Sequence, residues 1–526
     1  MIDSISFYSD RRMLSKLLKT LPLLMLPCCI QMVQAQDEPE RLLPEGLGFS
    51  NHLEYAYDWE KKIEILENWL NLDYRHKIFS AGLRFEVFQP NDPNPAINRG
   101  KEKYADIAFK YIGAEVGSHD EGADLMVGNY YILFGRGMVV RLWEDRLLRV
   151  DNNLLGLKIG GRYAGFNLRA LSGSGANSKA ERIDLLHAVD LEYQGPRWLR
   201  AGGTFALNQP EDKTAAPTRM AALRLQPSIW NFDLYGEFAV KQNSDLKQSV
   251  FGGKESFVGQ GIYLNANFFL GSFSLSAEYK YYDNMAFLTS DRTSFYNMPP
   301  AVQRDYSYVL LNRHPMPLDP NNEEGYQIEA NYNIGDATGF VASYSYTKSL
   351  GRDSYYQRIV GSQNESLELF RDAYGQAEHI WGDALLTRLA FGYREERVTN
   401  TKSITPILET RIDLDRRHAL RVILEHQQVI DRTTQEEYLT DVLVLELTKS
   451  PNLSLGLVGE METREPEAGK TERKYWLFGR VGFRIGDHTD GSILVGSRQA
   501  GNICIGGVCR YEPELRGVEL RLLTRF

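Results

Sequence analysis

The densest run of charged residues in the chain combines arginines with carboxylates. Its members are Arg136, Arg141, Glu144, Asp145, Arg146, Arg149 and Asp151. Opposed arginine and carboxylate groups across a water-filled passage create a transverse field that sorts polar solutes by charge and size. Gly135 and Gly137 permit a bulge or kink that would turn Arg136 inward. The run is therefore interpreted as a constriction; the alternative is an ion-paired strand end and loop that only stabilise the surrounding wall.

Two cysteines near the C-terminus have the spacing of a cross-strand disulfide. Gly506-Gly507 between them is a two-residue hairpin turn signal. Counting outward from this turn places Cys504 opposite Cys509 in a non-hydrogen-bonded pair, where Cα atoms lie about 4.5 Å apart. That separation suits a disulfide, which an oxidising compartment would close. A pair of zinc ligands is the alternative, disfavoured because no histidine or further cysteine is close in sequence.

Signatures of enzymes and cofactor sites are absent from the sequence. There is no Gly-x-Ser-x-Gly elbow, no phosphate-binding Walker loop and no His-Glu-x-x-His helix. The nine histidines are scattered, among them His426 on an expected strand, and each is interpreted as a surface or interfacial residue. We therefore predict no catalytic residue, no cofactor and no metal. The net charge of −9 also argues against nucleic acid as a partner, which would favour a basic face.

The N-terminus has the features of an export signal. Lys16 and Lys19 precede a short apolar stretch, and small residues follow at 33–35. The stretch is too short for a transmembrane helix, which needs about 20 apolar residues. We predict a signal peptide, with translation starting at Met1 or at Met13 and the mature chain beginning at Gln36.

Beyond this segment the sequence alternates with a period of two residues instead of a helical period. Apolar and polar residues alternate over 273–281, 326–334 and 340–346. A soluble β-sandwich also alternates, but the expected strands of 10 to 13 residues match the roughly 9–11 residues that a tilted membrane strand needs. The pattern therefore predicts membrane-spanning β-strands.

The expected connections between strands alternate strictly between short and long. Short turns are expected near 164–165, 270–272, 335–338 and 487–489, and long loops near 174–184, 284–323, 349–365 and 499–514. Tight periplasmic turns and longer extracellular loops are typical of outer-membrane barrels. The proline- and tyrosine-rich 284–323 loop is long enough to be functional, either as a gate folded into the mouth or as a cap on the outer rim.

The last strand resembles a known targeting signal. Its lipid-facing residues are expected to be Val518, Leu520, Leu522, Thr524 and Phe526. An amphipathic last strand with a terminal aromatic resembles the C-terminal signal of outer-membrane proteins, which the barrel-assembly machinery recognises. The stretch from Gly135 to Gly156 is similar to large, uncharacterised porin-like barrel proteins. This resemblance implies an outer-membrane barrel and lends no mechanism.

The fold class predicted is all-β: one transmembrane, antiparallel, up-and-down barrel of about 24 strands, within a range of 20 to 26, since single-chain bacterial barrels have even strand numbers. The predicted segments are a signal peptide at 1–35, a short periplasmic segment at 36–47 and the barrel at 48–526.

Alternation also assigns charged side chains to the lumen, where the bilayer does not penalise them. These are Lys110, Lys158, Arg162, Arg169, Arg224, Glu237, Arg388, Arg394, Arg411, Arg421, Arg480 and Arg484. Basic residues prevail in this set, which would favour anionic solutes.

The function expected from these features is a porin-like channel for small polar solutes across the cell outer membrane. A non-conducting barrel for surface polysaccharide or secretion-system assembly is the second hypothesis, and an outer-membrane hydrolase is the third. The expected partners are outer-membrane lipid, the barrel-assembly machinery and small polar solutes.

Overall fold

A computed structural model describes residues 44–88, 105–145, 150–177, 181–243, 258–313, 317–362, 364–465, 474–505 and 508–526, without the side chains of 88, 243 and 502–511. The predicted signal peptide, Arg146 and Arg149 lie outside the described residues, as does most of the segment at 36–47.

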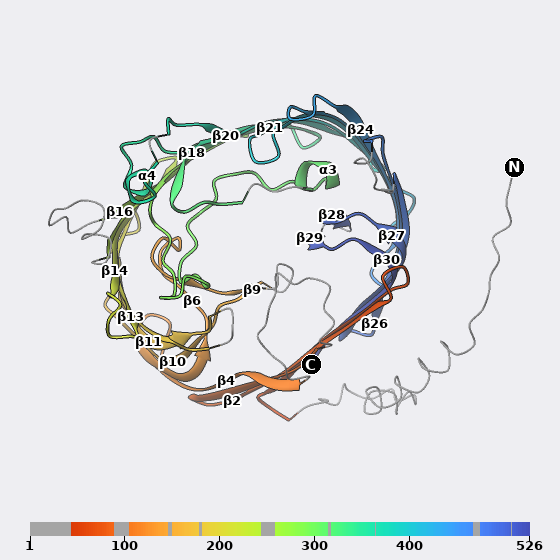
Figure 1. Ribbon diagram of the computed structural model, residues 1–526. Helices are drawn as coiled ribbons and strands as arrows, with labels where there is room; N and C mark the ends of the chain where they lie inside the picture. The colour runs from red at the N-terminus through yellow and green to blue at the C-terminus, as the bar shows by residue number, and fades with distance from the viewer. Residues whose placement is uncertain are drawn as a thin grey trace, which may run out of the picture. The chain divides into compact units, whose positions relative to one another are not determined.

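The chain from Gly46 onward forms a closed barrel whose wall is one antiparallel sheet of 24 strands (Figure 1). β1 (Leu47–Asp58) pairs with both β2 (Ile63–His76) and the last strand, β30 (Leu515–Arg525), so the sheet has no edge. The other wall strands are β3 (Phe79–Phe88), β4 (Ala105–Gly117), β5 (Gly122–Tyr130), β10 (Leu154–Tyr163), β11 (Phe166–Gly175), β12 (Asp184–Gln194), β13 (Leu199–Pro210), β14 (Thr218–Ile229), β15 (Phe232–Asn243), β16 (Gly259–Leu270), β17 (Phe273–Asp283), β18 (Asn322–Ile334), β19 (Thr338–Lys348), β20 (Glu368–Trp381), β21 (Leu385–Glu396), β22 (Thr401–Asp413), β23 (His418–Asp431), β24 (Glu437–Lys449), β25 (Leu453–Glu462), β26 (Tyr475–Ile485) and β27 (Thr489–Arg498). The predicted fold class and strand number are confirmed.

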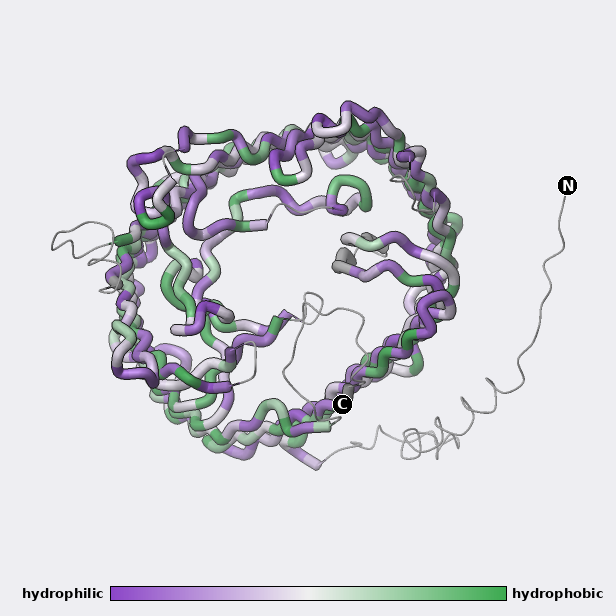
Figure 2. The backbone as a smooth tube through the Cα atoms, viewed as in Figure 1, coloured by the Kyte–Doolittle hydropathy of each residue, from purple (hydrophilic) through white to green (hydrophobic). Residues whose placement is uncertain are grey.

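The two faces of the wall differ because successive side chains of a strand point to opposite sides. In β14, Met220, Ala222 and Arg224 are buried, whereas Leu223 and Leu225 are 72% and 57% exposed. Apolar and polar residues alternate in this way along the wall (Figure 2). The exposed apolar face suits contact with lipid, and closure pairs the backbone groups that a bilayer cannot solvate. Among the described residues no helix is long and apolar enough to cross a membrane.

Short turns join the strands at one rim, such as 77–78, 164–165 and 271–272, and longer loops join them at the other. The expected alternation of loop length holds for most connections but not strictly, because 59–62 and 397–400 at the second rim have four residues, as many as 118–121 at the first. β5 ends at Tyr130, where the chain leaves the wall. Backbone φ angles of +53° at Gly135 and +84° at Gly137 would not continue a strand.

The last strand closes the barrel through contacts at both of its edges. Its partners are β27 and β1, and the terminal Phe526 exchanges backbone hydrogen bonds of 2.9 and 3.1 Å with Phe49. The Phe526 ring lies 5.8 Å from that of Phe49 and 4.7 Å from that of His488. On the inner face, Arg498 binds Glu519 at 2.8 Å. The terminal aromatic is thus part of the seam where the barrel closes.

Close backbone approach at this seam gives a test of closure. A Cβ atom added at Gly517 would lie 1.8 Å from the carbonyl oxygen of Tyr57, so Gly517→Val cannot pair with β1 without displacing it. We expect the variant to lose the heat-modifiable folded band on gels. Gly161→Ala is the matched control, because an added Cβ there meets no atom within 4 Å. Normal folding of Gly517→Val would contradict the seam geometry.

Candidate functional site

Two long loops fold into the barrel interior instead of standing above the rim (Figure 1). Inner loop A is residues 131–153, between β5 and β10, and inner loop B is residues 284–321, between β17 and β18. Inner loop A contains β6 (Ile132–Leu133), β7 (Arg141–Leu142), β8 (Glu144–Asp145) and β9 (Val150–Asp151), and inner loop B contains α3 (Val309–Asn312). Three further short elements lie outside these loops: the helix α4 (Tyr355–Ile359) in the 349–367 loop, and the hairpin of β28 (Gly501–Ile505) and β29 (Val508–Glu512) after β27. Of the two placements considered for the 284–323 loop, the structure shows the inward one.

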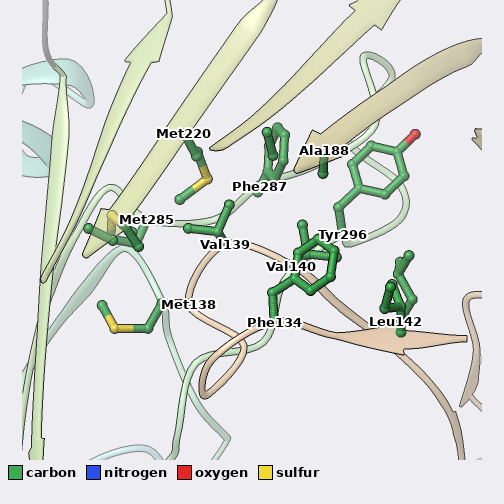
Figure 3. Close-up of a cluster of buried hydrophobic side chains, with 14 of the residues drawn as sticks. Phe134, Met138, Val139, Val140, Leu142, Ala188, Met220, Met285, Phe287 and Tyr296 are labelled. Carbon is green, nitrogen blue, oxygen red and sulfur yellow. The ribbon is translucent and has the colours of Figure 1, made fainter. Parts of the chain in front are cut away.

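Apolar side chains bind the inner loops to the wall. Phe134, Val139 and Val140 of inner loop A and Phe287 of inner loop B are fully buried, and they pack with Met220 of the wall (Figure 3). Fully burying a side chain of this size contributes about 1.5–3 kcal/mol. The cluster extends along the lumen side of β10 to β17 and holds both loops against that part of the barrel.

Hydrogen bonds join the two inner loops into one unit. The Asn297 amide donates to the carbonyls of Met138 at 2.8 Å and Met285 at 2.9 Å, and it accepts from the Phe287 backbone at 2.8 Å. The Arg141 backbone N–H donates to the Tyr296 carbonyl at 2.9 Å. Asn297 is 1% exposed, so its polar groups are all satisfied within protein. The inner loops are therefore fixed in place.

Burial also determines the protonation state of Tyr296 in inner loop B. The Tyr296 ring packs within the apolar cluster, and its hydroxyl has no hydrogen-bond partner among the described atoms. Burial raises the pKa of the Tyr296 hydroxyl above its ordinary value, since the charged phenolate would lose its hydration. The ring therefore stays neutral and belongs to the support of the inner loops.

The turn that carries Arg136 is specified by its neighbours. Glu237 of β15 accepts the Arg136 backbone N–H at 3.0 Å. A Cβ at Gly135 would lie 2.7 Å from the Glu237 carboxylate oxygens, so glycine is required by space as well as by its φ angle. The Arg136 side chain is exposed, and its guanidinium lies 5.2 Å from the centre of the Tyr235 ring. Arg136 thus lies on a turn between two glycines of positive φ, beside Tyr235 and Glu237 of β15.

The β6–β7 ribbon presents Arg141 on one face. Leu133 pairs with Arg141 and Ile132 with Leu142, and directly opposed residues share a face. Ile132 and Leu142 are buried in the apolar cluster, whereas Leu133 is 48% exposed. Arg141 therefore lies on the free face of the ribbon, with its guanidinium 4.9 Å from a ring of Trp143.

The carboxylates of the predicted constriction bind other protein groups. Glu144 makes a bidentate pair with Arg84 of β3 at 2.7 and 2.9 Å. Asp151 accepts from the Tyr131 hydroxyl at 3.0 Å and lies 3.8 Å from Arg84. Asp145 also has a partner. Within the described part of the chain, Arg136 and Arg141 make no ion pair. The structure thus separates the predicted set into paired acids and two unpaired cations.

Arginines of the wall are neutralised by acidic neighbours. Arg224 binds Asp190 at 2.7 Å and Glu192 at 3.0 Å. Glu409 binds both Arg388 at 2.7 Å and Arg421 at 2.8 Å. Arg162, Arg169, Arg394, Arg411 and Arg484 also have carboxylate partners. The apparent excess of basic residues in the predicted lumen set therefore does not make the wall basic.

Lys110 lies on the outer face of the barrel, whereas the alternation of the sequence predicts the lumen. A register shift between Arg84 and Phe85 places Lys110 opposite Leu83, which is 38% exposed on the outer face. One extra residue at a bulge reverses the face of every residue beyond it. The alternation rule fails here because the sequence carries no visible mark of the bulge.

The second half of inner loop B, residues 304–313, lies along the opposite part of the wall, and we call it the lumen strap. The Tyr308 hydroxyl donates to Glu409 at 2.9 Å, and Arg313 pairs with Glu460 at 2.7 Å. Glu425 of β23 accepts the backbone N–H groups of Val309 at 2.9 Å and Leu310 at 2.7 Å. Sequence analysis did not predict these contacts. The signal that could have indicated them is the presence of Glu409, Glu425 and Glu460 at inward-facing positions of the strands near the strap.

The hairpin with the two cysteines has the expected register. Cys504 pairs with Cys509, and Ile505 pairs with Val508. The sulfur atoms lie outside the described atoms, so the disulfide stays a prediction. An added Cβ at Gly501 would meet Arg313 at 3.0 Å, which places the base of the hairpin against the end of the lumen strap.

Comparison with known proteins assigns a family. Over residues 23–526 the chain matches a model described as "Family of unknown function (DUF6029)". The chain belongs to this family. No curated protein matches it. With its closed barrel and apolar outer face, this family member is a bacterial outer-membrane β-barrel.

Solved structures similar to this member of the family are barrels as well. The translocation pore of the P pilus usher PapC has 10% identity and a TM-score of 0.46, covering 91% of this chain and 98% of that one. PapC in an E. coli P pilus tip assembly intermediate has 9% identity and a TM-score of 0.49, covering 93% and 63%. The siderophore receptor PirA from Pseudomonas aeruginosa has 9% identity and a TM-score of 0.41, covering 92% and 80%.

His426 and Asp441 form a polar pair on the outer face that sequence analysis did not identify. His426 Nδ1 lies 2.6 Å from Asp441 at a groove of about 830 Å³ along β21 to β26. The described groove lining contains no serine, threonine or cysteine, so the pair has no nucleophile beside it. Among the described residues no group of three metal-ligating side chains occurs.

Removing one acceptor should release the lumen strap. Glu425→Ala leaves two buried backbone N–H groups unsatisfied, at a cost of about 1–3 kcal/mol each. We expect faster trypsin cleavage after Arg304 and Arg313 in the folded barrel. Glu437→Ala on β24, where the side chain is exposed, is the control. Equal cleavage of both variants would mean that Glu425 does not hold the strap.

The disulfide has a direct chemical test. In the chain from Gln36 to the end, Cys504 and Cys509 are the only cysteines. Without reductant, neither thiol should react with iodoacetamide, so the intact mass stays unchanged; Cys504→Ser should then gain one adduct at Cys509. Two adducts on the unreduced wild-type protein would refute the bond.

Proposed function

We propose that this barrel is a porin-like channel for the passive passage of small polar solutes across the outer membrane. The observation that carries the proposal is the lumen-facing surface of the inner loops, where Arg136 and Arg141 make no ion pair with any described residue. A field from fixed charges at a narrow point is how channels of this kind sort solutes. Passage needs no cofactor, and we infer no catalytic activity.

The width of the barrel supports an incompletely filled lumen. Strands about 4.8 Å apart and tilted by about 35–45° give a 24-strand ring a diameter of roughly 45–50 Å. One packed layer of chain is about 10 Å thick. The described parts of inner loops A and B pack together against β10 to β17, and inner loop B continues along the interior to β23, so they narrow such a ring.

A non-conducting barrel is the second candidate, and one observation favours it. Inner loop B contacts the wall near β14 through Phe287 and near β23 through the lumen strap, so it is anchored at two distant places. A loop held this firmly suits a barrel that assembles or anchors surface polysaccharide or serves a secretion system. A hydrolase has less support, because the His426–Asp441 pair lacks a nucleophile in its described groove.

Export and insertion complete the proposal. We infer a signal peptide at residues 1–35, a short periplasmic segment at 36–47 and recognition of the last strand by the barrel-assembly machinery. Val518, Leu520 and Leu522 alternate there with buried Gly517 and Glu519, as an amphipathic signal requires.

Single-channel recording tests the proposal. We expect the refolded chain from Gln36 to give stable conductance steps in planar lipid bilayers. Gly517→Val, which should fail to close, serves as the control for contaminating channels. Silence from a protein that is heat-modifiable on gels and β-rich by circular dichroism would overturn the channel and favour the assembly role.

A further inference from the structure

We propose that the lumen-facing side of the inner loops binds small organic anions that carry an apolar or aromatic group. The site, which we call the anion patch, consists of Leu133, Arg136, Arg141, Trp143, Phe295 and Met298. The inference rests on the proposed channel function, since these anions would be its solutes, and it names their chemical class.

The charge of the patch comes from two guanidinium groups that no carboxylate neutralises among the described residues. The wall arginines engage acids, whereas Arg136 and Arg141 lie over the rings of Tyr235 and Trp143 at 5.2 and 4.9 Å. A ring covers only the flat face of a guanidinium. The N–H edge remains available for the paired hydrogen bonds that a carboxylate or phosphate accepts.

The two loops bring apolar groups to the same place. Leu133 shares the free face of the ribbon with Arg141. From inner loop B, Met298 donates its backbone N–H to the Gly137 carbonyl at 3.2 Å. The Asn152 amide donates to the carbonyls of Arg141 at 3.3 Å and Phe295 at 3.2 Å, which holds these two residues side by side.

Exposure of these apolar side chains needs an explanation. Leu133, Phe295 and Met298 are 48%, 47% and 37% exposed, although the same loops bury Phe134, Val139 and Val140 completely. They lie on the lumen side, so lipid cannot cover them. Apolar groups that adjoin a few convergent polar groups mark ligand sites. An amphiphilic anion satisfies both features, because its charged group pairs with the arginines and its apolar part covers the exposed side chains.

The dependence on ionic strength distinguishes binding at the anion patch from the general effect of charge in the lumen. The Debye length is about 30 Å at 0.01 M salt and about 3 Å at 1 M. At low salt the two charges influence ions across much of the bore; at high salt they act only on a ligand in contact. We therefore expect the ion selectivity to decrease as the salt concentration rises. An aromatic anion should still bind at high salt, because its apolar contacts with the patch are not screened.

One double variant and a matched control test the patch. Arg136→Gln/Arg141→Gln removes the two charges, and Arg219→Gln removes a charge from the outer face of β14, where Arg219 contacts only Gln242. At about 0.01 M KCl, we expect reversal potentials to show a chloride-to-potassium permeability ratio at least about two-fold lower in the double variant. The control should match wild type.

Binding is measured independently of conductance. Saturation-transfer NMR on the detergent-solubilised protein uses benzoate as the aromatic anion and benzyl alcohol as its neutral counterpart. We expect a benzoate signal for wild type and Arg219→Gln that is largely lost in the double variant. Benzyl alcohol should give a weak signal that does not change among the three proteins.

The combined outcomes distinguish the two claims. Conductance with unchanged selectivity and unchanged benzoate binding in the double variant overturns the anion patch and leaves the channel standing. Silence in bilayers together with arginine-dependent benzoate binding overturns the channel and supports the site. Silence with no benzoate binding overturns both.

Discussion

The whole structure depends on the pairing of backbone groups where β1 meets β30. A bilayer offers no hydrogen bonds to an open sheet edge, so a wall of this size is stable in lipid only if its first and last strands pair. Gly517 lets the two backbones approach, and the terminal Phe526 exchanges hydrogen bonds with Phe49. Once the ring is closed, every strand has one face for lipid and one for the interior. The polar inner face, its ion pairs and the inward loops all follow from that division.

A ring of this diameter leaves far more interior than its own side chains can fill. The chain deals with this by giving two loops their own apolar core, against the lumen side of β10 to β17. Wall arginines bind wall carboxylates, which avoids unpaired charge at the packed surfaces. The guanidinium groups of Arg136 and Arg141, which form no ion pair within the described part of the chain, lie instead at the free surface of inner loop A. Ion pairs thus stabilise the packed wall, whereas the proposed role in selectivity falls to the two arginines of inner loop A.

Much of this fold could be predicted from the sequence because barrel strands obey a strict period and their connections alternate in length. The number of strands and the hairpin register at Cys504 and Cys509 both follow from local rules. Contacts between distant segments do not. Nothing local links Glu425 to Val309, or Asn297 to Met138, and the bulge that reverses Lys110 leaves no mark in the sequence. For the same reason, the division of the charged run into paired acids and unpaired arginines emerged only from the structure.

The course of inner loop B has a mechanical consequence. A wide, thin-walled ring deforms easily into an oval, since hydrogen bonds between strands resist stretching much better than they resist a change of curvature. Phe287 anchors the first part of the loop near β14, and the N–H groups of Val309 and Leu310 anchor a later part to β23. The loop is thus an internal strut between two distant arcs of the cylinder. A change in the cross-section of the wall would therefore shift inner loop B, and with it the part of inner loop A beside Arg136, because Asn297 and Tyr296 join the two loops.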